Sequence, residues 1–278
     1  MLDTHALAIT PGAALVLGNT GAIAGGGDGA QVAGVPVRPD AVLRMFGAGS
    51  IAANSIANIR LRSQDMVDPI NGITFTPGAA SLLSQYIEYT TLPYKTGARE
   101  LTMGTNVGVN AAMGFLIDEY KNGNNTYPCI KGSRSMGGEV MTGAHTFGGA
   151  LTANTWGTLA YAPGTALPNG RYAILGAYVS AITNGALIRF THADFGNFKP
   201  GFPVANYETV STSSWDEVTK DPLVMMEAGQ QFVYLSEILG TPCCPVFTAS
   251  NAGTGLTIEI CDAIADTPVV NLMLVKVA

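Results

Sequence analysis

The sequence has few charged residues. Only 12% of its 278 residues are Asp, Glu, Lys or Arg, against roughly 25% in an average globular domain, while 47% are apolar. Fourteen basic and twenty acidic residues give a net charge of −6. Because electrostatic affinity for nucleic acid comes from clustered Lys and Arg, this composition argues against a protein that binds DNA or RNA by neutralising phosphates.

Long apolar runs are also missing. No run approaches the roughly 18 to 20 residues needed to cross a bilayer. The first basic residue, Arg38, comes too late for the charged start of a secretory signal. We therefore expect this weakly charged surface to be buried against other protein molecules. The simplest cover is further copies of the chain, because obligate interfaces resemble a domain core cut in half.

Catalytic constellations are scarce as well. The chain has three histidines, His5, His145 and His192, and neither a G-x-S-x-G elbow nor a phosphate-binding loop. His192 and Asp194 could share one face of an extended segment with His145 as a third metal ligand, but we interpret His192 as a strand-end histidine satisfied by local hydrogen bonds. We expect no enzymatic activity, no cofactor and no metal site.

A pair of carboxylates for glycoside hydrolysis is not excluded by the sequence, because the distance between two carboxylates depends on the fold. Acidic residues in loops and at strand ends are, however, usually just solvated. The candidates are Asp118, Glu119, Asp216, Glu217 and Glu237.

The four cysteines show no metal or redox spacing. Cys243 and Cys244 are adjacent, which is a poor arrangement for bridging each other, and Cys129 and Cys261 stand alone. No C-x-x-C pair occurs. We interpret all four as buried or semi-buried thiols rather than a disulfide framework.

One stretch is repeated. Residues 171–194 contain two apolar runs around Asn184-Gly185, a strong turn signal, and are predicted to form a β-hairpin. A shift of 129 positions places Ile59-Arg60-Leu61 on Ile188-Arg189-Phe190. We interpret this match as a trace of two related β-units in tandem.

Strand patterns dominate the rest of the chain, with a turn signal about every ten residues. Ser81–Tyr89 could instead be a short helix, because Leu82, Leu83, Tyr86 and Tyr89 have helical spacing. Roughly twelve or more strands with almost no amphipathic helix favour antiparallel sandwiches or barrels. The candidate strands are 41–46, 56–62, 70–75, 82–90, 99–103, 112–119, 231–239, 256–261 and 269–277.

Three regions follow from these patterns. Residues 1–34 are rich in Gly and Ala and contain no Lys or Arg, which predicts a flexible or extended N-terminal arm. Short apolar pieces at residues 6–9 and 13–17 could still add as strands to a neighbouring sheet edge. Residues 35–155 form the first predicted β-barrel unit and residues 156–278 the second. The Gly-rich stretch from residue 137 to residue 170, which includes this boundary, shows no clear strand pattern.

Aromatic residues cluster after the predicted hairpin. Phe195, Phe198 and Phe202, together with Trp215 further along, are the candidate interface residues. Core and interface packing explains them better than a carbohydrate platform does. We expect the phenylalanine loop to insert into a neighbouring copy, because aromatic anchors commonly dominate interfaces.

The repeated phrase, the Gly-rich N-terminal segment and the sparse charge together resemble the double jelly-roll major capsid proteins of icosahedral viruses and tailless phages. The likeness is architectural and covers residues 35–278. It implies an all-β fold of two tandem antiparallel jelly-roll units, which assemble as homotrimers that tile a shell. A single decorated jelly roll, or two unlike β-domains, would produce much the same sequence.

The resemblance also implies partners and a location. The partners would be other copies of the chain, other capsid proteins such as penton or minor proteins, and in many members an internal membrane. It would be found in the virion after assembly in the host cytoplasm. The alternatives are a cellular surface-layer or sheath protein, a phage tail, spike or decoration protein, and a glycan-active enzyme or lectin.

Overall fold

The computed structural model describes residues 2–9, 41–50, 59–63, 73–75, 90–92, 101–105 and 111–119, and then, with short gaps, residues 127–205 and 231–278. Most of the described residues lie in β-strands, and all strand pairing is antiparallel. The first strands are β1 (Leu2–Ile9), β2 (Ala41–Ser50), β3 (Ile59–Ser63), β4 (Ile73–Phe75), β5 (Thr90–Leu92), β6 (Leu101–Thr105) and β7 (Ala111–Glu119).

The later elements begin at Cys129. No helix in the described ranges is long and apolar enough to span a membrane. The elements are β8 (Cys129–Ile130), β9 (Val140–Met141), β10 (Ala144–Thr146), β11 (Trp156–Ala160), β12 (Gly170–Ser180), β13 (Gly185–Thr191), the 3₁₀ turn η1 (Ala193–Phe195), β14 (Gly201–Ala205), α3 (Gln231–Leu239), β15 (Cys244–Ala249), β16 (Thr257–Asp262) and β17 (Val269–Lys276).

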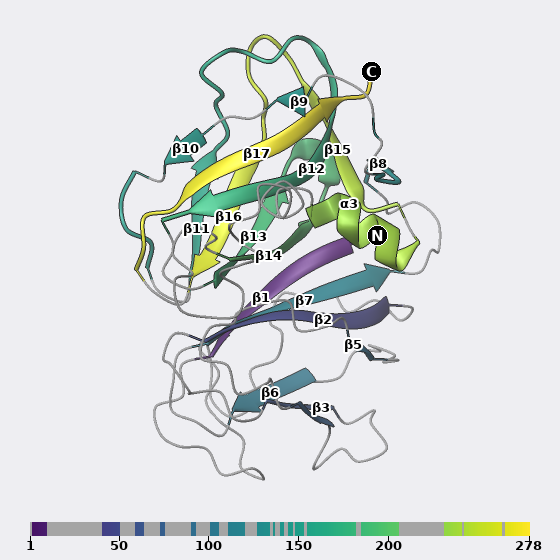
Figure 1. Ribbon diagram of the computed structural model, residues 1–278, viewed down its shortest axis with the longest axis vertical. Helices are drawn as coiled ribbons and strands as arrows, with labels where there is room; N and C mark the ends of the chain where they lie inside the picture. Colours follow the sequence, from purple (N-terminus) through teal and green to yellow (C-terminus); the bar gives the residue numbers. More distant parts are fainter. Residues whose placement is uncertain are drawn as a thin grey trace, which may run out of the picture.

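The strands form four sheets, each named here after one of its strands. The β1 sheet has the order β1-β7-β2-β5 and the β3 sheet the order β4-β3-β6. The β12 sheet has the order β10-β17-β12-β15-β8, with β9 on β17 beside β10, and the β13 sheet has the order β11-β16-β13-β14. Figure 1 shows them stacked from the β12 sheet at the top to the β3 sheet at the bottom.

The two halves of the chain repeat the same neighbour relations. The long strand β2 or β12 lies between the final strand of its half, β7 or β17, and a later strand, β5 or β15. The other edge of that final strand is flanked by β1 in the first half and by β9 and β10 in the second, where β8 on the edge of β15 has no counterpart among the described strands of the first half. In the companion sheet, β3 or β13 lies between the next strand along the chain, β4 or β14, and the penultimate strand, β6 or β16.

A β-bulge recurs at matching places. The register of β2 against β7 shifts between Phe46 and Ala48, and that of β12 against β17 shifts between Ile174 and Gly176. Gly47 and Leu175, the residues inside the two shifts, lie 128 positions apart, close to the shift that aligns Ile59 with Ile188. A bulge increases the local twist of a strand, so both long strands are bent at the same level.

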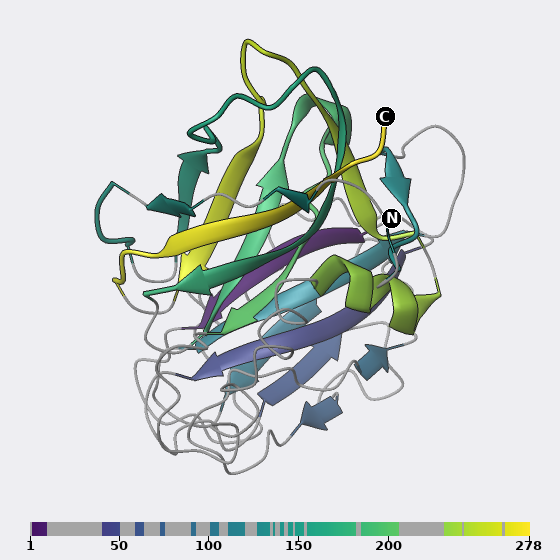
Figure 2. The same cartoon turned by 45° about the horizontal axis from the view of Figure 1, so that its top comes forward.

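The described core lies between the β12 and β13 sheets. On β17, Val270, Leu272 and Leu274 are fully buried while the residues between them are partly exposed, which is the alternation expected of a strand with one face on a core. Ile188 and Phe190 of β13 bury the facing side. Figure 2 shows α3 lying beside the sheets, and this helix contacts β12, β14 and β15.

The structure corrects the predicted hairpin. β12 and β13 follow one another in the chain but belong to different sheets. β13 is paired along both of its edges, with β14 and with β16, whereas β12 is paired with β17 over most of its length and with β15 only at residues 170–173. A strand has only two edges for ladder hydrogen bonds. The short link between them is therefore a crossing from one sheet to the other.

The predicted strand over residues 231–239 is wrong, because these residues form α3. Phe232, Val233, Leu235 and Ser236 are its buried residues. Their spacing of one, three and four positions marks one face of a helix. The content of Phe, Val and Tyr favoured a strand locally, and the tertiary packing overrode that preference.

The N-terminal segment begins with a strand. Leu2–Ile9 pairs along its whole length with residues 111–118 of β7. This strand includes residues 6–9, the piece that could add to a sheet edge, and it is part of a sheet of this chain rather than a free arm. Residues 10–40 lie outside the described part of the chain. The strands that pair within the second half begin at Cys129, earlier than the predicted boundary at 155/156.

Candidate functional site

The predicted interface phenylalanines lie in the core. Phe195, Phe198 and Phe202 are 1%, 5% and 0% exposed. The rings of Phe195 and Phe198 pack on Tyr127, with centroids 5.6 and 5.4 Å away, and Phe202 packs edge-on against Phe232 at 4.8 Å. The chain itself therefore covers these rings, which leaves them no free surface for a neighbouring copy. Trp215 lies outside the described residues.

His192 has a local hydrogen bond, as predicted, and a second one to a residue 62 positions away in the chain. It follows β13 and caps η1, where its Nδ1 accepts from the Asp194 N–H at 2.9 Å. Its Nε2 lies 3.1 Å from the Thr254 carbonyl oxygen. Since a carbonyl can only accept, Nε2 carries the proton, and both ring nitrogens are engaged.

Asp194 is also engaged within the chain. Its Oδ2 accepts the backbone N–H of Thr248 at 2.8 Å, which ties η1 to β15. Among the described residues no group of three His, Cys, Asp or Glu side chains is placed to hold a metal ion. The side chain of His145, on β10, is not described.

The cysteines are free thiols, as predicted from their spacing. Cys243, Cys244 and Cys261 are buried and Cys129 is partly buried. Burial raises the pKa of Cys244 to about 12, with a further contribution from Cys129. The Cys243 thiol donates to the Phe232 carbonyl oxygen at 3.0 Å. Burial also raises the pKa of Cys129, so the nucleophilic thiolate is disfavoured at Cys129 and Cys244.

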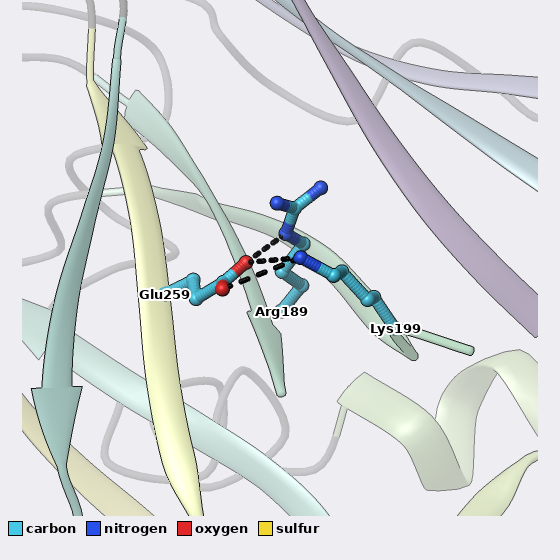
Figure 3. A network of polar contacts seen from close by, with 3 residues as sticks. All are labelled: Arg189, Lys199 and Glu259. Carbon is cyan, nitrogen blue, oxygen red and sulfur yellow. Dashed lines mark hydrogen bonds and ion pairs between the residues drawn. The ribbon is translucent and has the colours of Figure 1, made fainter. Parts of the chain in front are cut away.

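An ion cluster on the β13 sheet was not predicted. Arg189 on β13 stands directly opposite Glu259 on β16, and its Nε donates to Glu259 Oε2. Lys199, just before β14, places its Nζ 3.4 and 3.3 Å from the two carboxylate oxygens. Figure 3 shows both cations converging on this one carboxylate.

Trp156 completes the cluster. The Arg189 guanidinium carbon lies 3.7 Å from the centre of the Trp156 ring, well within cation–π range. Trp156 is at the start of β11, on the far side of β16 from β13. The cluster thus joins three neighbouring strands and the segment that leads into β14.

The cluster is largely withdrawn from water. The side chains of Arg189 and Glu259 are 10% and 11% exposed, and that of Lys199 is 35% exposed. A carboxylate shared by two cations is arranged to hold chain segments together. The sequence did contain a signal, because Arg189 and Glu259 each interrupt an apolar strand, but only strand register shows that they face each other.

No family model matches this chain, and no curated protein matches it. Among solved structures, the T=1 Penaeus vannamei nodavirus, determined by cryo-EM, is similar with 7% sequence identity and a TM-score of 0.24. The alignment covers 100% of this chain and 98% of that chain. A likeness at this level does not establish a shared fold, so the strand order has to carry the functional argument.

Proposed function

We propose that this chain is a structural viral coat protein, which self-assembles as homotrimers into an icosahedral shell. Its role is passive and requires no catalysis and no cofactor. Its partners would be copies of itself, other coat proteins such as penton or minor proteins, and in some shells an underlying membrane. The protein would then reside in the virion.

The observation that carries this proposal is the strand order. A jelly roll consists of eight strands in two four-stranded sheets with the orders 1-8-3-6 and 2-7-4-5. The strands of the second half fit this scheme when β9 and β10 are counted as one, because both pair with β17 in one continuous register, and when the two-residue strand β8 on the edge of β15 is left outside it. The β12 sheet then supplies 1-8-3-6 and the β13 sheet 2-7-4-5.

The first half supports a second jelly roll. The β1 sheet has the order 1-8-3-6 and the β3 sheet the order 7-4-5 when one strand position is left open between β1 and β2. Ile59 and Ile188 then occupy the fourth strand of their halves. Two such units in one chain are the architecture of the capsid family that the sequence resembles.

The amino-acid composition of this chain favours a coat protein over other proteins with a jelly-roll fold. Fold alone does not determine function, since lectins and cupins also use jelly rolls. A chain with 12% charged and 47% apolar residues is, however, suited to burying much of its surface against copies of itself. The outermost strands of the β13 sheet, β11 and β14, offer edges that assembly would cover.

The test is the assembly state of the purified, untagged protein. Light scattering after size exclusion and negative-stain electron microscopy should reveal trimers, closed shells, or both. The assemblies should persist at ~1 M salt, where charge screening acts within about 3 Å, because apolar burial would drive them. Sheets or tubes would instead favour a surface-layer or sheath protein, and monomers at every concentration would overturn the proposal.

A further inference from the structure

β11 is an edge strand of the β13 sheet. It pairs with β16 along its whole length, and within the described part of the chain no other strand pairs with it. The Tyr161 N–H donates to the Leu256 carbonyl oxygen at 2.8 Å, so the alternation of the antiparallel ladder turns every second residue toward β16. The backbone groups of Trp156, Thr158 and Ala160 therefore point to the open edge, where Thr158 and Ala160 are exposed.

This edge lacks the features that usually keep strands from pairing with other molecules. Natural edge strands are protected by charged side chains, by Pro or by bulges. Residues 140–170, which include β11, are the longest stretch of the chain without Asp, Glu, Lys or Arg. β11 contains no Pro, and its register against β16 is unbroken. Figure 1 shows it at the margin of its sheet, beyond β16. Such an edge is a template for a further strand.

The opposite edge of the same sheet is formed by β14, and it is protected. The Phe190 N–H donates to the Pro200 carbonyl oxygen at 2.8 Å. By the same alternation, the backbone of Pro203 points away from β13. Proline has no N–H to donate, so β14 cannot offer a complete ladder to another strand. The difference between the two edges identifies β11 as the one suited to pairing.

Charge favours a second copy of this chain as the partner. Each copy has a net charge of −6, so two copies meet at least electrostatic cost where neither carries charged side chains. The side chain of Thr158 lies on the outer face of the β13 sheet, the face turned away from the core, because its pair Glu259 lies between the buried residues Ile258 and Ile260. Leu159, on the other face, packs against the core.

The sequence of β11 is complementary to itself in the antiparallel direction. With Thr158 opposite Thr158 of the second copy, Trp156 lies opposite Ala160 and Gly157 opposite Leu159. Each large side chain then meets a small one, and Thr–Thr pairs stabilise neighbouring strands. The same register brings together the residues whose backbone groups point to the open edge, so the ladder is complete.

We propose that β11 pairs antiparallel with β11 of a second copy about a two-fold axis at Thr158, so that the β13 sheets of two copies continue as one. A two-fold contact uses the same surface on both copies and cannot by itself build a trimer. It would link one trimer to the next. The inference deepens the proposed self-assembly and rests on it, since it specifies one of the contacts between copies.

Cysteine cross-linking tests this register. Directly opposite residues have Cβ atoms about 4.5–5.5 Å apart, near the separation that a disulfide bridges, so Thr158→Cys should form a covalent dimer under mild oxidation on a non-reducing gel. Ala160→Cys is the matched control on the same exposed strand. Its counterpart would lie about 13 Å further along the paired strand, so it should give at least tenfold less dimer. Equal cross-linking of both variants, or none with Thr158→Cys, would contradict the proposal.

A charge at the same position separates this contact from assembly in general. Thr158→Lys places two like charges opposite each other and should raise at least tenfold the concentration at which trimers associate further. Thr165→Lys, in an exposed loop, should leave that concentration unchanged. Light scattering and electron microscopy measure both. Normal particles from Thr158→Lys would overturn the β11 contact while the coat function stands, whereas an original chain that stays monomeric would overturn both.

Discussion

Gly201 lies in β14 directly opposite Arg189 of β13. A Cβ atom at this position would clash with the Ile188 carbonyl oxygen and would stand 2.8 Å from the Arg189 Cα. Both are backbone atoms, so the two strands would have to separate, with the Arg189 side of the ion cluster moving as well. Only glycine therefore allows β14 to pair this closely with β13.

Gly201→Ala should consequently lower the free energy of unfolding by ~3 kcal/mol, at the upper end of overpacking costs. Gly164→Ala is the matched control, because a Cβ there meets no atom within 4 Å. Both substitutions reduce the entropy of the unfolded chain in the same way. The difference between their urea midpoints thus reports the clash alone, and equal midpoints would show that β14 does not pair with β13 as described.

The thiol of Cys244 predicts a loss of stability at alkaline pH. Its pKa is raised from 9.0 to about 12 in the folded chain, so the unfolded chain releases this proton first. Stability from this group is fully present below about pH 9 and is lost as the pH rises toward 12. Burial raises the pKa of Tyr161 from 10.0 to about 12, which adds a second contribution within the same window.

Urea unfolding at several pH values between 8 and about 11 measures this loss. Lysines and other tyrosines also titrate in this range, so Cys244→Ala serves as the reference. The variant should be less stable at pH 8, because of the lost packing, but should lose less stability per pH unit above about pH 9. Parallel curves for the two proteins would contradict a buried, neutral thiol.

Residues were predictable from the sequence only where their partners are local. His192 bonds to Asp194, two positions away, and its role followed from its place at a strand end. The partners of Glu259 lie 60 and 70 positions away, so register in space had to bring them together. The phenylalanine loop was likewise recognised as an anchor, but its partners Tyr127 and Phe232 belong to this chain's own core.

At the level of elements, alternation and turn signals located many strands. The predicted segments at 41–46, 99–103, 112–119, 256–261 and 269–277 overlap β2, β6, β7, β16 and β17. The short strands β8, β9 and β10 lie among Gly and Pro residues and are defined by their pairing with β15 and β17. Strands of two or three residues are too short to show the alternation of apolar and polar residues by which a strand is recognised in a sequence.

Sheet membership was the harder problem. The turn signal between β12 and β13 predicts a hairpin, because local sequence cannot show that both edges of β13 are occupied by β14 and β16. α3 was misread for a related reason, since its apolar residues suit a strand as well as a helix until the buried face is known.

β1 provides a prediction at this scale. Residues 2–9 pair with β7 over the full length of the strand, so replacing them with a Gly-Ser sequence of equal length should expose that edge of β7. We expect about tenfold faster hydrogen exchange in β7, and a lower unfolding midpoint. An unchanged midpoint and unchanged β7 protection would indicate that residues 2–9 act as a free arm after all.

For the molecule as a whole, the repeated phrase at Ile59 and Ile188 proved more informative than its length suggests. Each of these residues lies in a strand that pairs with the next strand along the chain and with the penultimate strand of its half. The bulges in β2 and β12 are separated by nearly the same number of positions as Ile59 and Ile188. A short sequence match, a matching strand order and a matching bulge are three separate observations. Together they favour an arrangement of two similar halves over two unrelated β-domains.

This arrangement predicts that the second half can fold alone. Within the described ranges, every ladder partner of β8 to β17 lies between Cys129 and Lys276. We expect a fragment of residues 127–278 to unfold cooperatively, with a near-ultraviolet circular dichroism signal from Tyr172, Phe190 and their buried neighbours. It should be less stable than the full chain, because the outer face of the β13 sheet loses its cover.

The same fragment separates a buried ion cluster from an exposed one. In the full chain, the Arg189 and Glu259 side chains are 10% and 11% exposed, so Glu259→Gln leaves two cations without their carboxylate at a largely buried site and should cost ~3 kcal/mol. β13 and β14 contact β2 and β7, which the fragment lacks. If these strands cover the cluster, the fragment exposes it to water, where an ion pair contributes about 0–1 kcal/mol, and the same substitution should have little effect on the unfolding midpoint. If Glu259→Gln cost as much in the fragment as in the full chain, the β1 sheet would not be what buries the cluster, and the halves would be joined in another way.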